Sequence, residues 1–165
     1  MENSMARLIA LLTLKERTME EMACILSEEQ RRIMEMNPAA VAESNLMKEE
    51  VTSRLARLAD ECRVLMASVG VERGLEQSVN LSLVIDTASD SERQNLVPLQ
   101  QRLLLLAGSL RRQQDLSRRM LTHSLGLIQR SMALFSKLLG GCDTYGARGR
   151  VCTGSAGISF LSREI

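Results

Sequence analysis

An apolar residue returns every third or fourth position through the first 36 residues, and this spacing constrains the fold more than any other feature. Only Lys15 and Glu29 interrupt the stripe. A 3-4 repeat kept over four heptads predicts one long helix, at about residues 3–36, that packs against other helices. The stripe consists of Met5, Leu8, Leu12, Met19, Met22, Leu26, Ile33 and Met36.

A second long helix is predicted over residues 38–69. Asn37 ends the first helix, because a residue that precedes a proline avoids the helical region, and it can cap the next helix with Pro38 at the first position. Gly70 is a natural stop. So short a turn predicts an antiparallel hairpin. The apolar seam of this helix is Val51, Leu55, Leu58, Cys62, Leu65 and Val69.

Residues 70–90 predict a short connecting helix, although the alternating residues 79–85 would also suit a strand. Ser89 and Glu92 have the spacing of a capping box and announce a third long helix, at about residues 91–139.

Two apolar seams lie along this third helix, and the polar Gln113 and Ser117 stand where they meet. The phase slips by four residues there, as in a stutter. Either the packing partner changes at this point, or the helix leaves its bundle and offers the second seam to another protein. The first seam is Leu99, Leu103, Leu106 and Leu110, and the second is Leu121, Leu125, Ile128, Met132, Phe135 and Leu139.

Composition agrees with helix-on-helix packing, because 45% of the residues are hydrophobic but only 2% are aromatic. We therefore predict an all-α fold: three long helices in an elongated, antiparallel, coiled-coil-like bundle over residues 1–139, with a short connecting helix. Residues 140–165 hold six of the ten glycines and two of the three aromatic residues, Tyr145 and Phe160. They predict a flexible, partner-binding tail.

No group of residues has the spacing of an active site, so we expect neither an enzyme nor a bound cofactor. The one histidine, His123, has no cysteine or carboxylate at ligand or triad spacing. The cysteines form no CxxC pair, which favours reduced thiols over a metal site. No apolar run is long enough to span a membrane.

Charge is unevenly distributed. Residues 1–90 carry 10 basic and 16 acidic side chains, whereas residues 91–139 carry 8 basic and 2 acidic ones. The basic helix could bind nucleic acid, but no aromatic or Asn/Gln-rich recognition face accompanies its arginines, so packing beside the acidic helices is favoured. The stripes contain many of the ten methionines, which give adaptable apolar surfaces. An interaction protein follows, and a self-assembling scaffold is the alternative.

The sequence "TYGARGRV", placed after a long helix that ends "SMALFSKLLGG", resembles the C-terminal region of FlgN-type flagellar export chaperones. That family has long helices followed by a tail with a Tyr-Gly-x-x-Gly element. The segment "LMKEEVTSRLARLADECRVLM" is similar to the family's second helix, with Lys48 and Arg63 at matching places. Gln114 and Ser117 depart from an Asn-x-x-Asn-Gly-like element of the third helix.

The resemblance implies a cytoplasmic chaperone that binds C-terminal helical segments of hook–filament junction proteins and docks at the membrane-embedded gate of the flagellar type III export apparatus. It implies no nucleic acid partner, and exposed seams on long helices also allow a homo-oligomer. Carried over, it assigns cargo contact to the second seam (Leu121, Leu125, Ile128, Met132 and Phe135) and export-gate docking to Tyr145, Gly146 and Gly149.

Overall fold

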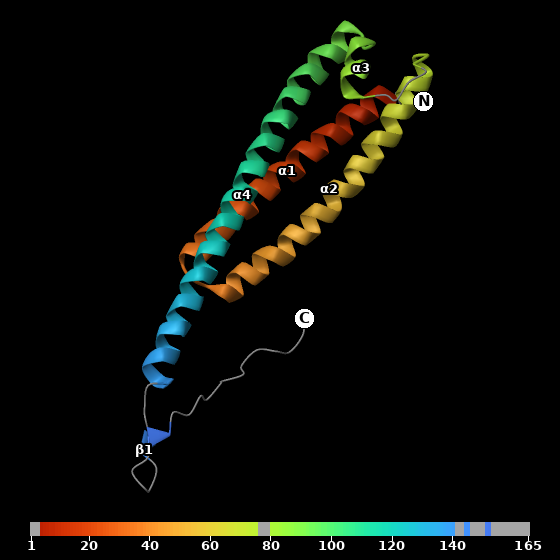
Figure 1. Ribbon diagram of the computed structural model, residues 1–165. Coiled ribbons are helices and arrows are strands. Elements are labelled where there is room, and N and C mark those ends of the chain that lie inside the picture. The colour runs from red at the N-terminus through yellow and green to blue at the C-terminus, as the bar shows by residue number, and fades with distance from the viewer. Residues whose placement is uncertain (1–3, 76–79, 141–143, 146–150, 153–165) are drawn as a thin grey trace. The chain divides into compact units, whose positions relative to one another are not determined.

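The computed structural model describes residues 4–75, 80–140, 144–145 and 151–152. Its helices are α1 (Ser4–Met34), α2 (Pro38–Glu72), α3 (Leu81–Asp86) and α4 (Asp90–Gly140) (Figure 1). Strands β1 (Thr144–Tyr145) and β2 (Val151–Cys152) pair in antiparallel fashion. The all-α prediction is confirmed, with three long helices and a short one between the second and third. The strand alternative for residues 79–85 is wrong, because Leu81–Asp86 is helical.

The chain divides into two compact units, residues 1–121 and 122–165, and α4 runs without a break from the first into the second. The expected division into a bundle over residues 1–139 and a tail over 140–165 stays a prediction. Most of that tail lies outside the described residues, and its described part is the β1–β2 pair, which the sequence reading did not anticipate.

In the first unit, α1 and α2 are antiparallel. The hydroxyl of Ser4 donates to Glu72 Oε1 at 2.5 Å, and Arg54 pairs with Glu21 at 2.5 Å farther along the same two helices. α4 runs in the same direction as α1, because Glu16 meets Arg102 and Gln30 meets Gln113. The first unit is therefore an up-down-up arrangement, closed by the short α3.

The predicted seams form the core of this unit. One cluster joins α1, α2, α3 and α4, and a second joins α1, α2 and α4. Met36 is the exception in the α1 stripe, since it is exposed and lies past the end of the helix. The buried residues of the two clusters are Met5, Leu8, Leu12, Cys62, Val69, Val84, Ile85, Leu96 and Leu99, and Met19, Met22, Ile25, Leu26, Val51 and Leu110.

The turn between α1 and α2 follows the local rules predicted for it. The side chain of Asn37 accepts a hydrogen bond from the Ala40 amide at 3.1 Å, and Pro38 opens α2. Met36 closes α1 in the left-handed region, with φ of 53°, while its amide donates to the carbonyl of Ile33. A residue other than glycine is strained in this conformation.

Replacement of Met36 by glycine is expected to stabilise the protein by about 1 kcal/mol, because glycine adopts positive φ without steric cost. Met36 is 58% exposed, so little packing is lost. Thermal unfolding followed by circular dichroism measures the effect. Met47→Gly is the control: Met47 is also exposed but lies inside α2, where glycine should destabilise by about 1 kcal/mol. A loss of stability in both variants would contradict the prediction.

An ion pair between a buried carboxylate and a half-buried lysine accounts for one of the two interruptions of the α1 stripe. Glu29 is fully buried, and Lys48 of α2 donates to its Oε1 at 2.5 Å. The other carboxylate oxygen, Oε2, is buried and has no hydrogen-bond partner among the described residues. The interruption is therefore a charged layer inside the bundle rather than a solvated position.

The polar positions of α4 also have a partner on α1. The side-chain amide of Gln30 donates to the Gln113 carbonyl at 3.2 Å and lies 3.4 Å from the hydroxyl of Ser117, which is buried. The slip of phase in the α4 seams therefore coincides with a polar layer between α1 and α4.

Ion pairs join α4 to the rest of the first unit at two places among the described residues. Arg102 of α4 lies 2.5 Å from Glu16 of α1, and this hydrogen bond holds the pKa of Glu16 below its ordinary value. At the start of α4, the Ser89 amide donates to the Glu92 carboxylate at 2.9 Å, which confirms the capping box and lowers the pKa of Glu92. Arg73 also reaches Glu92. Packing of the basic helix beside an acidic helix is thus seen where Arg102 meets Glu16.

Candidate partner-binding site

The second seam of α4 is the site that the sequence predicts for cargo contact, and most of its apolar side chains are exposed. Leu125, Ile128, Met132 and Phe135 are 59%, 48%, 58% and 60% exposed. Leu121, the last residue of the first unit, is half-buried. Because α4 is helical throughout and these residues recur at intervals of four and three, their side chains share one face. Within the second unit, the structure therefore brings four of the five predicted cargo-contact residues into one stripe: Leu125, Ile128, Met132 and Phe135.

The sequence did not predict a second exposed stripe, which consists of Leu127, Leu134 and Leu138. These residues are 39%, 58% and 65% exposed. They recur at intervals of seven and four, so they form a row beside the first stripe. A test for apolar positions outside the main seam would have found them. The seven exposed residues of the second unit are called the α4 apolar face below: Leu125, Leu127, Ile128, Met132, Leu134, Phe135 and Leu138.

Exposure of this face is continuous. Every residue from Leu127 to Leu138 is exposed, so the described part of the chain leaves the face uncovered. Large apolar patches on a protein surface mark sites of interaction, and an amphipathic helix offers its partner anchors at helical spacing. Leucine, methionine and phenylalanine are side chains that adapt to a partner and bury a large area.

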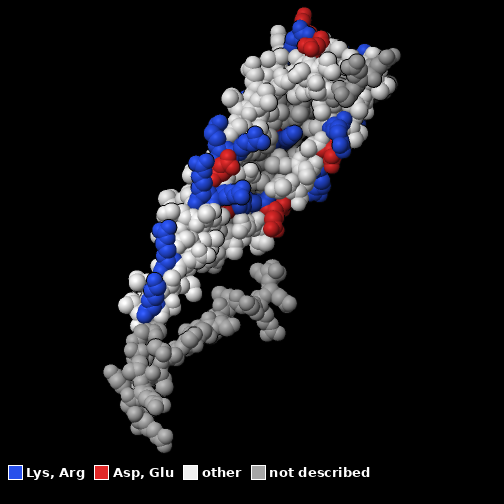
Figure 2. Space-filling view, viewed as in Figure 1, with Lys and Arg blue, Asp and Glu red and all other residues white. Residues whose placement is uncertain are grey.

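Basic residues border one edge of the face. Arg130 follows Leu127 by three positions and precedes Leu134 by four, and Lys137 follows Leu134 by three. Both cations therefore adjoin the second stripe. Neither forms an ion pair within the described residues. From Leu116 to Gly140 the sequence contains no acidic residue, and Figure 2 shows Lys and Arg side chains spaced along this part of α4.

The structure describes only the backbone of Tyr145. This residue lies in β1 and pairs with Val151 of β2. Gly146 and Gly149, the other two residues predicted to dock at the export gate, lie outside the described residues. Their assignment to the gate stays a prediction.

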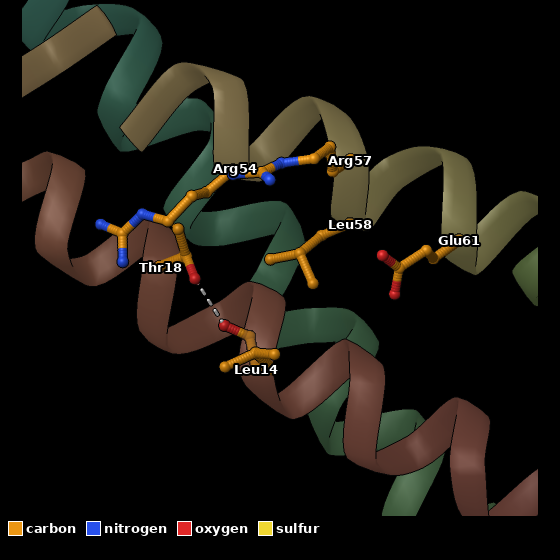
Figure 3. Close-up of a pocket in the computed structure, with 6 residues that line it drawn as sticks. All are labelled: Leu14, Thr18, Arg54, Arg57, Leu58 and Glu61. Carbon is orange, nitrogen blue, oxygen red and sulfur yellow. Dashed lines mark hydrogen bonds between the residues drawn. The ribbon is translucent and has the colours of Figure 1, made fainter. Parts of the chain in front are cut away.

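A pocket of the first unit lies between α1 and α2. Figure 3 shows this pocket, which has a volume of about 220 Å³ and is lined by charged and apolar side chains. Two of its polar groups have structural roles: the Thr18 hydroxyl donates to the Leu14 carbonyl at 2.9 Å, and Arg54 pairs with Glu21. Within the described ranges, no cluster of His, Cys, Asp or Glu could hold a metal ion.

His123 and Cys62 lie outside this pocket. His123 is exposed on α4. Cys62 is buried in the core, and burial raises the pKa of its thiol, which keeps it protonated and unreactive. A search of the described helices finds none that is long and apolar enough to cross a membrane.

Comparison with known proteins identifies one family. Residues 1–152 match the family model described as "FlgN protein". This match spans all the described helices and both strands, and so includes the α4 apolar face and Tyr145. Neither the curated proteins nor the solved structures contain a significant match.

Proposed function

This chain belongs to the FlgN family of flagellar export chaperones, and from that membership we propose that it carries hook–filament junction proteins. It binds a C-terminal helical segment of the cargo through the α4 apolar face. While bound, the segment cannot take part in assembly, and the complex is delivered in the cytoplasm to the flagellar type III export gate. The exposure of the α4 apolar face is the observation that carries this proposal.

The face has the physical properties that such a carrier needs. Its side chains are only partly covered by their own helix, so each contributes roughly 1 kcal/mol or more when a partner helix buries the remainder. Association costs several kcal/mol in lost freedom, which leaves an affinity that permits release. Hydrophobic burial of this kind requires no nucleotide.

The tail carries out the second step, which is docking at the export gate. Tyr145, with Gly146 and Gly149 beside it, docks at the membrane-embedded export gate. One buried aromatic side chain contributes roughly 1.5–3 kcal/mol, which is enough to anchor a short segment but not to lock it. The neighbouring glycines allow close approach of the backbone to the partner.

The alternative functions would use α4 in different ways. A scaffold or homo-oligomer would use the α4 apolar face against a second copy of the chain. A nucleic-acid binder would depend on the exposed arginines Arg111, Arg112, Arg118 and Arg119, with an affinity that falls steeply as salt rises. A chaperone instead forms a one-to-one complex with an apolar helical segment.

Calorimetry against the C-terminal segment of a hook–filament junction protein tests the first step, with one-to-one binding expected. Tyr145→Ala should bind the segment as the wild type does but reduce its secretion from cells at least tenfold, because the two steps use different residues. Val151→Ala is the matched control, since Val151 is the pairing partner of Tyr145 and lies outside the tyrosine element. Absence of binding, or equal secretion defects in the two variants, would contradict the corresponding step.

A further inference from the structure

Basic side chains lie along only one edge of the α4 apolar face. Apolar contact with a partner helix does not by itself require such a distribution. Arg130 and Lys137 follow one edge, next to the stripe of Leu127 and Leu134. The opposite edge, next to Met132, carries Gln129 and Ser136, which are exposed and neutral. The face is therefore basic on one side only.

Both cations are available to a partner. Their side chains form no ion pair within the described residues, and no acidic residue lies between Leu116 and Gly140 to compensate them along the helix. Uncompensated charge at the rim of an apolar patch selects partners of opposite charge and suppresses those of like charge.

From this arrangement we infer that the cargo segment is an acidic amphipathic helix, with Asp or Glu along the edge that lies against Arg130 and Lys137. This inference rests on the proposed function and adds the chemistry that the cargo must have. Helix-in-groove partners present anchors at three- and four-residue spacing, and their flanking charges set the orientation. The one-sided row thus specifies which way the cargo helix faces.

The same row disfavours other occupants of this face. A second copy of the α4 apolar face in antiparallel orientation would bring like charges together, because the same edges of the two helices would meet. A flat anionic bilayer would meet both edges alike, so it would gain nothing from cations confined to one of them. Nucleic acid offers phosphates but no apolar surface to cover seven exposed side chains.

A charge-reversal experiment with the full chain tests the inference. Binding of the junction-protein segment is measured by calorimetry for the wild type, for Arg130→Glu with Lys137→Glu, and for Arg111→Glu with Arg112→Glu. The last pair changes net charge equally but lies in the first unit, at exposed positions of α4. Reversal at 130 and 137 should raise Kd about tenfold, because two attractions become repulsions. The control should stay within about twofold.

The cargo side completes the cycle. A peptide whose Asp and Glu residues are replaced by Asn and Gln should bind the wild type about fivefold more weakly, and should bind the reversed variant no worse than the native peptide does. A native segment that has no acidic residue on one edge would overturn the inference. So would equal losses in the two charge variants, or no loss in either.

The outcomes separate this inference from the proposed function. Wild-type binding that ignores both sets of charges leaves the chaperone proposal standing and overturns only the acidic-cargo inference. No binding by the wild type overturns both. Sedimentation with anionic phosphatidylglycerol vesicles that depends on Arg130 and Lys137, together with peptide binding that does not, would assign the row to a membrane surface instead.

Discussion

Replacement of Met132 and Phe135 by aspartate is expected to raise the Kd for a junction-protein segment at least about 100-fold, with little change in the melting temperature. Both side chains belong to the first stripe of the α4 apolar face and are 58% and 60% exposed. Exposed positions contribute little to folding, so the variant should fold normally. Aromatic and apolar anchors commonly contribute 2 kcal/mol or more each to binding, and an unpaired charge there adds a desolvation cost.

The matched control lies on the same helix. Leu104 and Leu105 are 67% and 73% exposed but belong to the first unit, away from the α4 apolar face. Their replacement by aspartate makes the same change of charge and removes comparable apolar surface, yet should leave Kd within about twofold. Calorimetry gives Kd, and circular dichroism gives the melting temperature. Equal weakening by the two variants would remove the α4 apolar face as the cargo site.

The largest effect on stability is expected at the buried pair of α1 and α2. Lys48→Met should lower the free energy of unfolding by about 3 kcal/mol, because it leaves the carboxylate of Glu29 buried and without its charged partner. The Oε2 atom of Glu29 already lacks a hydrogen bond, so no other group in the described structure takes over. Denaturant unfolding at neutral pH measures the loss.

The exposed pair between the same two helices provides the control. Arg54 and Glu21 lie 2.5 Å apart, as Lys48 and Glu29 do, but their side chains are 37% and 48% exposed. Arg54→Met should cost at most about 1 kcal/mol, because solvent screens the pair. The double variant Glu29→Met with Lys48→Met should recover most of the loss, since no charge stays buried. Similar losses in the free energy of unfolding from Lys48→Met and Arg54→Met would show that burial does not determine what an ion pair contributes to stability.

The helices could be predicted because their signals are local. The 3-4 spacing of Met5, Leu8 and Leu12 requires one buried helical face, and the Asn37-Pro38 pair ends one helix and starts the next. The stripe of the candidate site followed from the same spacing in Leu125, Ile128 and Met132. The tyrosine element gave the family, which the match over residues 1–152 confirms.

Spacing alone left open which seam is buried and which is exposed, because an apolar face has the same period whether it contacts its own chain or another protein. The first seam of α4 packs at Leu99 and Leu110, whereas the second is exposed at Leu125, Ile128, Met132 and Phe135. Gln113 and Ser117 interrupt the apolar seam, and the structure places Gln30 of α1 beside them. Glu29 interrupts the α1 stripe. Its partner, Lys48, could not be predicted from the spacing, because it lies 19 residues away on another helix.

The sequence by itself determined the all-α class, the extents of the three long helices to within three residues, and the family, because capping, periodicity and turn chemistry act between residues that are near one another in the chain. Only the tertiary structure decided which polar residues are buried together and that the α4 apolar face, with its second stripe at Leu127, Leu134 and Leu138, stays exposed beside Arg130 and Lys137. Burial depends on which segments meet in space, and that is a property of the packed helices rather than of any one of them.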